Sequence, residues 1–327
     1  MAQEQIKTVS PAQIKTTADG IIANISKVLY GKEHKLRLVL CALLCGGHIL
    51  LDDIPGTGKT TLARALAKSI DCDCKRIQFT PDLLPSDITG INYFNQKTGD
   101  FVFRAGPLHT NIVIADEINR TTPRTQSALL ECMEERQATV DGVTYAMQDP
   151  FFVIATQNPL ESQGTFPLPE AQIDRFFMRL SLGYPDRESE KKMLTANSGS
   201  RVSEAPIGAL QSVCTRAELL AAMASLSAIT VSESVKDYIV RVADATRTVE
   251  KLRVGISPRG TLALFRAARA FAALSGRDFV LPDDVKAVAL PVMAHRVIVR
   301  SQNTIRMSES AEVVLEYILS KVPAPIE

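Results

Sequence analysis

The residues with the clearest chemical meaning form one short glycine-rich stretch, Pro55-Gly56-Thr57-Gly58-Lys59-Thr60-Thr61. An apolar run at 48–51 predicts a strand before it, and helical periodicity over 60–70 predicts a helix after it. In that context the backbone N–H groups and the helix dipole favour a bound phosphate. We expect Lys59 to contact the β- and γ-phosphates, and the Thr60 hydroxyl to bind Mg²⁺. The stretch, including Thr61, therefore predicts a binding loop for ATP with Mg²⁺.

One position departs from the full glycine pattern, because Asp53 stands where the first glycine is expected. We expect this change to affect only the geometry at the beginning of the loop.

Two adjacent acids follow another strongly apolar run. Residues 112–115 predict a buried strand, and Asp116 and Glu117 come directly after it. The carboxyl ends of parallel strands open at one edge of a sheet, where the glycine loop also lies. Asp116 is placed to hold Mg²⁺ through water, and Glu117 to orient and activate the attacking water.

Three further residues fit the same chemistry. The apolar run at 151–155 continues into Thr156-Gln157-Asn158-Pro159, and the Asn158 amide is suited to binding the γ-phosphate or to positioning the water. Arg175 lies in Asp174-Arg175-Phe176, and Arg259 lies at the start of a predicted helix. An arginine stabilises the charge that builds on a transferring phosphoryl group. For each arginine a surface salt bridge is the alternative interpretation.

The elements that position these residues follow from the apolar patterning. Short apolar runs alternate with helical periods in the first half, which is typical of a parallel sheet covered by helices on both faces. Strands are predicted at 48–51, 76–79, 112–115, 151–155 and 177–182, and helices at 34–45, 60–70 and 124–136. Turn signals predict hairpins near 92–103 and 138–145. After Pro185 only helical periods remain, at 217–226, 234–248, 261–274, 283–295 and 311–321. We predict an α/β nucleotide-binding core over 1–187, then a linker near 197–206 and an all-α lid domain within 188–327.

Composition excludes several classes of protein. A chain of 327 residues with 46% hydrophobic and 22% charged residues is expected to fold into about two globular domains. Its net charge of +1 shows no general basic excess, which disfavours nucleic acid as the main partner. We find neither a membrane-spanning apolar run nor a signal peptide, so we expect a soluble, cytoplasmic protein. The six cysteines form no Cys-x-x-Cys pair, and we expect Cys41 and Cys45 to be buried thiols rather than metal ligands.

Taken in order, the motifs resemble the MoxR-type AAA+ ATPases over nearly the full length of the chain. The matching stretches are Pro55-Gly-Thr-Gly-Lys-Thr60, Ala115-Asp-Glu-Ile-Asn-Arg120, Thr125-Gln-Ser-Ala-Leu-Leu-Glu131, Glu134-Glu-Arg-Gln137, Phe152-Val-Ile-Ala-Thr-Gln-Asn-Pro159, Pro167-Leu-Pro-Glu-Ala-Gln172, Asp174-Arg-Phe176 and Ser257-Pro-Arg259.

The resemblance implies an AAA+ core with a helical lid that works as a ring, usually a hexamer. It implies that Asn158 is the first sensor, that Arg175 is the finger acting on the neighbour's ATP, and that Arg259 is the second sensor. The two hairpins then resemble the helix-two insert and the pre-sensor insert of the subgroup that includes magnesium chelatases and replicative helicases. The family is linked to assembly or activation of other proteins, often with a partner that carries a von Willebrand A domain.

Three other functions stay open at this point. A nucleic-acid motor would use basic hairpins, and the second hairpin has no basic residue. The ATPase subunit of a metal chelatase would co-purify with a large metal-inserting subunit. A nucleotide-gated scaffold without turnover is opposed by the intact Asp116, Glu117 and Arg175.

Overall fold

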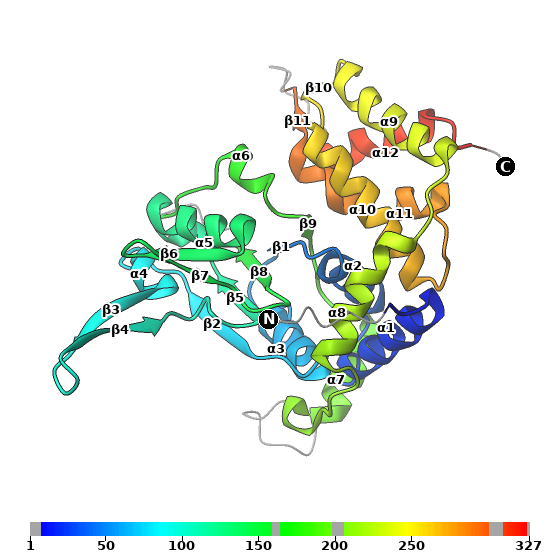
Figure 1. Ribbon diagram of the computed structural model, residues 1–327. Coiled ribbons are helices and arrows are strands. Elements are labelled where there is room, and N and C mark those ends of the chain that lie inside the picture. The colour runs from blue at the N-terminus through cyan, green and yellow to red at the C-terminus, as the bar shows by residue number, and fades with distance from the viewer. Residues whose placement is uncertain (1–7, 159–163, 198–205, 301–309, 326–327) are drawn as a thin grey trace.

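The computed structural model describes residues 8–158, 164–197, 206–300 and 310–325. Figure 1 shows an α/β part that carries a projecting hairpin at one end, with a group of helices packed at the opposite end. The predicted linker at 197–206 lies almost entirely outside the described residues.

A five-stranded sheet in the order β2-β5-β8-β1-β9 forms the centre of the α/β part, and every neighbouring pair of strands is parallel. Its strands are β1 (Ile49–Asp52), β2 (Cys74–Gln78), β5 (Ile112–Asp116), β8 (Phe152–Gln157) and β9 (Met178–Leu180). All five therefore end at the same edge. The predicted α/β fold class is confirmed.

Apolar side chains leave this sheet on both faces. In β5, Ile112 and Ile114 join one buried cluster, whereas Val113 and Ala115 join a second cluster on the opposite face. Successive side chains of a strand point to opposite faces, so a continuous apolar run fits a strand that is covered twice. Because both faces of the sheet are buried, the sequences of these strands do not alternate between apolar and polar residues.

The α/β part also contains a set of helices. They are α1 (Pro11–Ile25), α2 (Glu33–Leu44), α3 (Lys59–Ser69), α4 (Pro85–Thr89), α5 (Pro123–Glu135), α6 (Glu170–Ile173) and α7 (Arg187–Asn197). Helix α1 was not predicted from the sequence, although Ser10 and Gln13 form a capping box at its start. Its buried residues include Ile14, Ala18 and Ile21, which share one face of the helix at helical spacing.

The second part contains α8 (Arg216–Ser225), α9 (Glu233–Thr248), α10 (Pro258–Leu274), α11 (Pro282–Met293) and α12 (Ala311–Lys321). It also contains a short antiparallel pair, β10 (Leu252–Val254) and β11 (Ile298–Val299), in a region where only helices were expected. Strands of two or three residues are too short to produce a periodic signal, so the sequence did not indicate them.

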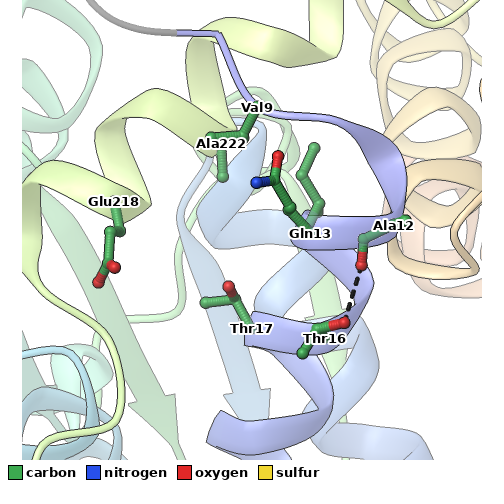
Figure 2. Close-up of a pocket in the computed structure, with 8 residues that line it drawn as sticks. Val9, Ala12, Gln13, Thr16, Thr17, Glu218 and Ala222 are labelled. Carbon is green, nitrogen blue, oxygen red and sulfur yellow. Dashed lines mark hydrogen bonds between the residues drawn. The ribbon is translucent and has the colours of Figure 1, made fainter.

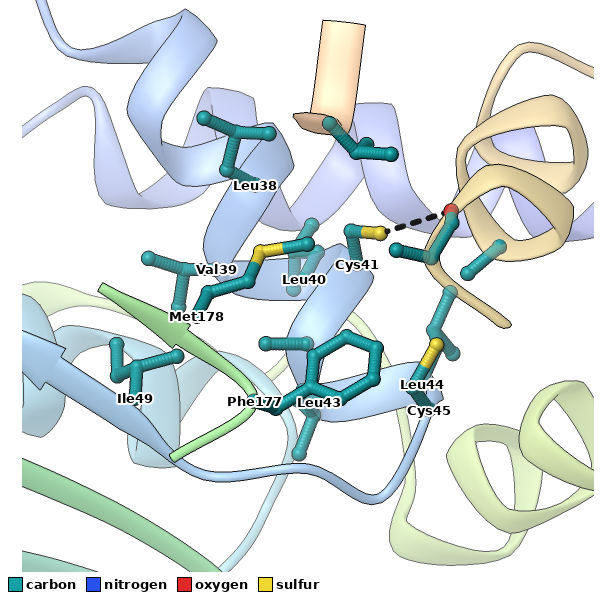
Figure 3. Close-up of a cluster of buried hydrophobic side chains, with 14 of the residues drawn as sticks. Leu38, Val39, Leu40, Cys41, Leu43, Leu44, Cys45, Ile49, Phe177 and Met178 are labelled. Carbon is teal, nitrogen blue, oxygen red and sulfur yellow. Dashed lines mark hydrogen bonds between the residues drawn. The ribbon is translucent and has the colours of Figure 1, made fainter. Parts of the chain in front are cut away.

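One hydrophobic cluster runs through both parts of the molecule. Figure 3 shows side chains of α2, among them Leu40 and Leu43, packed with Phe177 and Met178 beside the sheet. On its other side α2 packs against α10. Cys41 and Cys45 are buried there as predicted, and the Cys41 thiol donates to the Ala267 carbonyl over 3.3 Å. Burial raises the pKa of the Cys41 thiol well above its usual value. The group of helices is therefore packed firmly on the sheet, through α2.

Two hairpins project from the α/β part, formed by β3 (Gly90–Asn95) with β4 (Asp100–Ala105) and by β6 (Gln137–Val140) with β7 (Val143–Ala146). They contact each other. The Asn92 amide donates to the Asp141 carboxylate over 2.9 Å, and the rings of Phe103 and Tyr145 stack at 3.8 Å. In the part of the chain that the structure describes, no helix combines the length and the apolar character needed to cross a membrane.

His48 ties three elements together at the beginning of β1. Its Nδ1 accepts from the Val153 N–H over 3.0 Å, so Nε2 carries the proton and donates to the Met133 carbonyl over 3.0 Å. Burial, together with the charge of Arg136, lowers the pKa of His48 to about 4 from 6.5. Both nitrogens of the neutral His48 ring therefore take part in hydrogen bonds.

This burial predicts sensitivity to acid. The folded-state pKa lies below the unfolded value, so stability is complete above pH 6.5 and is lost as the pH falls toward 4. Between pH 7 and pH 5 we expect His48 to account for a loss of about 2 kcal/mol. Urea unfolding at both pH values should show that the free energy of unfolding falls less in His48→Gln than in the unaltered chain. An equal fall in both proteins would show that His48 is not the source of the acid sensitivity.

Candidate functional site

The glycine loop joins β1 to α3 at the carboxyl edge of the sheet. Gly56 and Gly58 have φ of +85° and +93°, a conformation that favours glycine. A β-carbon at Gly58 would lie 2.7 Å from the Leu29 side chain, whereas the space around Gly56 is open. The chain can therefore approach a phosphate closely at Gly56.

Lys59 is the first residue of α3, and its side chain folds back over the loop. Its Nζ donates to the carbonyls of Asp53 and Ile54 over 2.8 and 3.3 Å. A phosphate oxygen is a stronger acceptor than a carbonyl because the hydrogen bond is assisted by charge on both partners. The loop thus holds the ammonium group where a phosphate would compete for it.

Asp53 has a clear structural role. It is only 4% exposed, and its carboxylate accepts from the Ser181 hydroxyl and from the backbone N–H groups of Leu182 and Gly183, over 2.7, 2.7 and 3.0 Å. These residues follow β9, so the aspartate ties the beginning of the loop to the neighbouring chain segment. Glycine could not make this connection, which explains the departure from the usual pattern.

Asp116 and Glu117 stand at the end of β5, in the central region of the same edge. One Asp116 oxygen accepts from the Thr156 hydroxyl over 2.6 Å, and the other forms an ion pair with Arg76 at 2.7 Å. Glu117 has a left-handed backbone with φ of 56°. Strained conformations of this kind cluster at functional sites. Here the strain turns the chain sharply just after the strand.

The Glu117 carboxylate is held by two polar groups. It accepts from the Gln78 amide over 2.7 Å and forms an ion pair with Arg120 at 3.3 Å. Gln78 is the last residue of β2 and pairs in register with Asp116. Arg76 and Gln78 were not identified from the sequence, because only the sheet order shows that β2 lies beside β5.

Thr156 organises the two acids from β8. It is fully buried, and its hydroxyl donates to Asp116 while accepting from the Glu117 N–H over 2.9 Å. Sequence reasoning missed this residue, although a threonine just after the apolar run of a central strand was an available signal. Asn158 comes two residues later, is 6% exposed, and follows the strand that lies between β5 and β1. The sheet order therefore brings Asn158 between the acids and the glycine loop.

These residues fit a nucleotide with Mg²⁺. The donor set combines an open glycine turn, one ammonium group, the threonines of the first turn of α3, and the Asp116 carboxylate at the end of β5 on the same edge. Hydroxyl and carboxylate oxygens are ligands that Mg²⁺ accepts in nucleotide sites. The side chain of Asp116 remains 13% exposed on this edge, so it is accessible to a bound water.

The two candidate arginines lie together, away from the glycine loop and the two acids. Arg175 and Arg259 both form ion pairs with Glu134 of α5, at 3.1 and 2.7 Å, and their side chains are 35% and 54% exposed. They line a cavity of about 410 Å³ with Gly46, Gly47 and His48. Those three residues precede β1, whereas the glycine loop follows it. The arginines therefore lie toward the amino edge of the sheet, and a four-residue strand separates the two edges by roughly 13 Å.

Another pocket, of about 370 Å³, lies between α1 and α8 (Figure 2). It is lined mainly by apolar and hydroxyl side chains such as Val9, Thr17 and Ala222, with Glu218 at its rim. None of the residues predicted for nucleotide chemistry lines it, so it is separate from the candidate site.

Comparisons with known proteins agree with this geometry. The ATPase family associated with various cellular activities (AAA) matches residues 48–178, and the AAA lid domain matches residues 244–316. The uncharacterized protein YeaC of Bacillus subtilis is 46% identical over 94% of each chain. The protein named chaperone MoxR1 of Mycobacterium tuberculosis is 37% identical, with 94% of this chain and 82% of the relative covered. The crystal structure of a proposed ATPase from Cytophaga hutchinsonii superposes with a TM-score of 0.88 at 38% identity, covering 97% of both chains.

Proposed function

The chain belongs to the MoxR family of AAA+ ATPases, and on this basis we propose that it hydrolyses ATP as a ring, to remodel, assemble or activate other protein complexes. The observation that carries the proposal is the meeting of the glycine loop, Asp116, Glu117 and Asn158 at one edge of the sheet. Nucleotide binding and the polarisation of water require these groups within reach of one γ-phosphate.

Each residue has a role that follows from its position. Pro55, Gly56, Thr57 and Gly58 form the turn around the phosphates, and Lys59 moves from the loop carbonyls to the β- and γ-phosphates. Glu117 accepts a proton from the attacking water, while Asn158 orients that water or the γ-phosphate.

Mg²⁺, when bound, neutralises charge on the β- and γ-phosphate oxygens. The Thr60 hydroxyl is proposed as a direct ligand, and Asp116 as a ligand through water. Thr156 keeps Asp116 oriented by donating to the other carboxylate oxygen. Thr61 completes the first turn of α3 next to the phosphates.

Arg175 and Arg259 are proposed to act on the ATP of a neighbouring subunit. Both lie toward the edge of the sheet opposite their own glycine loop, and both are partly exposed. Their shared partner Glu134 keeps the two guanidinium groups side by side until phosphate charge replaces it. We propose that a ring, most simply a hexamer, brings these two arginines to the γ-phosphate bound by the adjoining subunit.

The two hairpins are proposed as the part that meets a client protein. Phe94 and Phe101 of the first hairpin are largely exposed, and the bond from Asn92 to Asp141 couples the hairpins to each other. A relative that carries the name chaperone supports a protein as the client. A partner with a von Willebrand A domain and a cytoplasmic location belong to the same proposal. A nucleic-acid motor is not favoured, because the second hairpin offers no basic residue. A chelatase subunit is not favoured either, because a magnesium-chelatase relative matches 57% of the chain, whereas the chaperone relative matches 94%.

Glu117→Gln provides the direct test of hydrolysis. We expect it to bind ATP normally and to turn over at least about 10²-fold more slowly, because glutamine cannot accept the proton of the attacking water. Phosphate release should be measured alongside binding of a fluorescent ATP analogue. Glu316→Gln, the same change at an exposed position on α12, should leave both unchanged. Turnover at the unaltered rate in Glu117→Gln would remove this residue from its role.

A further inference from the structure

The most completely satisfied buried charge in the described chain belongs to Arg296, which follows α11. Its side chain is 3% exposed, and burial opposes its charge. Its Nε donates to the Asp174 carboxylate over 2.7 Å. Its remaining donors reach the carbonyls of Asp174, Phe176 and Phe177 over 3.1, 2.7 and 3.1 Å, and also the Val292 carbonyl. A buried guanidinium is tolerated only when it is paired and hydrogen-bonded in this way.

The carbonyls that Arg296 holds belong to the turn that carries Arg175. Residues 174–177 connect α6 to β9, and Arg296 binds the backbone on both sides of Arg175. The preceding residue adds a second contact, because His295 Nε2 lies 3.0 Å from the Phe176 carbonyl. Burial lowers the pKa of His295 well below its usual value, so the ring is neutral and donates one proton here. The turn is thus fixed from the lid rather than from the sheet alone.

Arg296 also lies against the turn that carries Arg259. A β-carbon added at Gly260, the next residue along, would stand 3.0 Å from Cδ of Arg296. The absence of a side chain at Gly260 lets the arginine stem pass between the first turn of α10 and the turn at 174–177. One buried side chain therefore touches both segments from which the exposed arginines project.

We propose that Arg296 is a positioning residue that sets Arg175 and Arg259 together toward the ATP of the neighbouring subunit. This inference rests on the proposed function, in which those two arginines act in trans. A misplacement of about 1 Å in a group at a reacting centre can cost roughly 10²-fold in rate. The hydrogen bonds of Arg296 go to residues 174–177 and to Val292, and none of them goes to the glycine loop. Loss of Arg296 should therefore spare the nucleotide site of its own subunit.

Steady-state kinetics supply the first readout. In Arg296→Gln we expect kcat to fall about 10²-fold while the Kd for ATP stays within about twofold. Arg296→Lys keeps the charge but loses the planar fork, so it should recover only part of the rate. Equal kcat values for Arg296→Gln and the unaltered chain, in rings of the same mass, would overturn the inference.

Subunit mixing supplies a readout that general destabilisation would not produce. Arg296→Gln subunits keep an intact loop, and Lys59→Ala subunits keep correctly set arginines. Mixed rings of the two should therefore recover activity above either variant alone. Mixed rings of Arg296→Gln with Arg175→Ala should recover no activity. Both variants are defective in the arginines that a subunit supplies to its neighbour, so no subunit in such a ring supplies them correctly.

The control is the mixture of Arg175→Ala with Lys59→Ala, which tests trans action itself. Recovery in that control without recovery for Arg296→Gln with Lys59→Ala overturns the role of Arg296 and leaves the proposed function standing. Failure of both overturns the trans action on which the inference rests. If Arg296→Gln does not fold, as judged by its melting curve, Asp174→Asn weakens the same contact from the other side. That variant must then show the same recovery pattern, or the inference is wrong.

Discussion

Arg175→Ala is expected to bind ATP almost normally and to hydrolyse it about 10³-fold or more slower, since an arginine supplied in trans contributes about 10³–10⁵ in rate in nucleotide hydrolases. The side chain lies toward the amino edge of the sheet, held by Glu134 at 3.1 Å, whereas the glycine loop lies at the carboxyl edge. Its removal should therefore leave the nucleotide pocket of its own subunit intact. Binding of a fluorescent ATP analogue and phosphate release would be measured on the same preparation.

The trans assignment has a sharper test in mixed rings. Arg175→Ala subunits and Lys59→Ala subunits are each expected to be nearly inactive alone. In a mixed ring an intact loop faces an intact arginine, so part of the activity should return. Arg241→Ala, which breaks an exposed ion pair with Asp237 on α9, serves as a matched arginine control and should change nothing. If mixed rings form, as judged by mass, and no activity returns, the assignment fails. Loss of ATP binding in Arg175→Ala alone would instead place the residue at its own subunit's site.

Lys59→Ala is expected to lose nucleotide binding. Lys59 is the only cationic side chain in the loop, and its Nζ already lies over the carbonyls at the loop's beginning. Hydrogen bonds to charged groups contribute about 1.5–3 kcal/mol each, so losing two should weaken binding by roughly 10²-fold or more. Titration with a fluorescent ATP analogue measures this directly.

The same helix offers a control for that substitution. Lys68 lies in the last turn of α3 and donates to the carbonyls of Ile207 and Gly208, away from the loop. Lys68→Ala should therefore leave ATP affinity unchanged. An unaltered affinity in Lys59→Ala would show that the loop does not bind the phosphates.

Local patterns were sufficient for the elements that hold the nucleotide site. The strand before Asp53, the helix from Lys59 and the strand before Asp116 are each encoded by neighbouring residues, because periodicity and loop composition act over short distances. The resemblance to the MoxR family rested on short motifs in a fixed order, and the comparisons with known proteins confirmed it. Helix α1 could have been recognised from its capping box and from the helical spacing of Ile14, Ala18 and Ile21.

Only the sheet order revealed the partners that other strands supply to the two acids. Thr156, Gln78 and Arg76 come from strands that are not adjacent to β5 in sequence, and their contacts depend on pairing register. The role of Asp53 depends likewise on residues 181–183, more than a hundred positions later. Long-range pairing of this kind leaves no local pattern, so no single sequence could show it.

By itself the sequence determined that this protein has a phosphate-binding loop, a pair of acids at a strand end, and arginines suited to phosphoryl chemistry. The edge of the sheet toward which those arginines lie was decided by the tertiary structure. The packing of α10 on α2, and the contacts of Arg296 with residues 174–177, bring Arg175 and Arg259 together beside Glu134, toward the edge opposite the loop. The physical reason is that a motif specifies the local course of the chain, whereas the placement of the lid depends on a hydrophobic cluster assembled from both halves of the molecule.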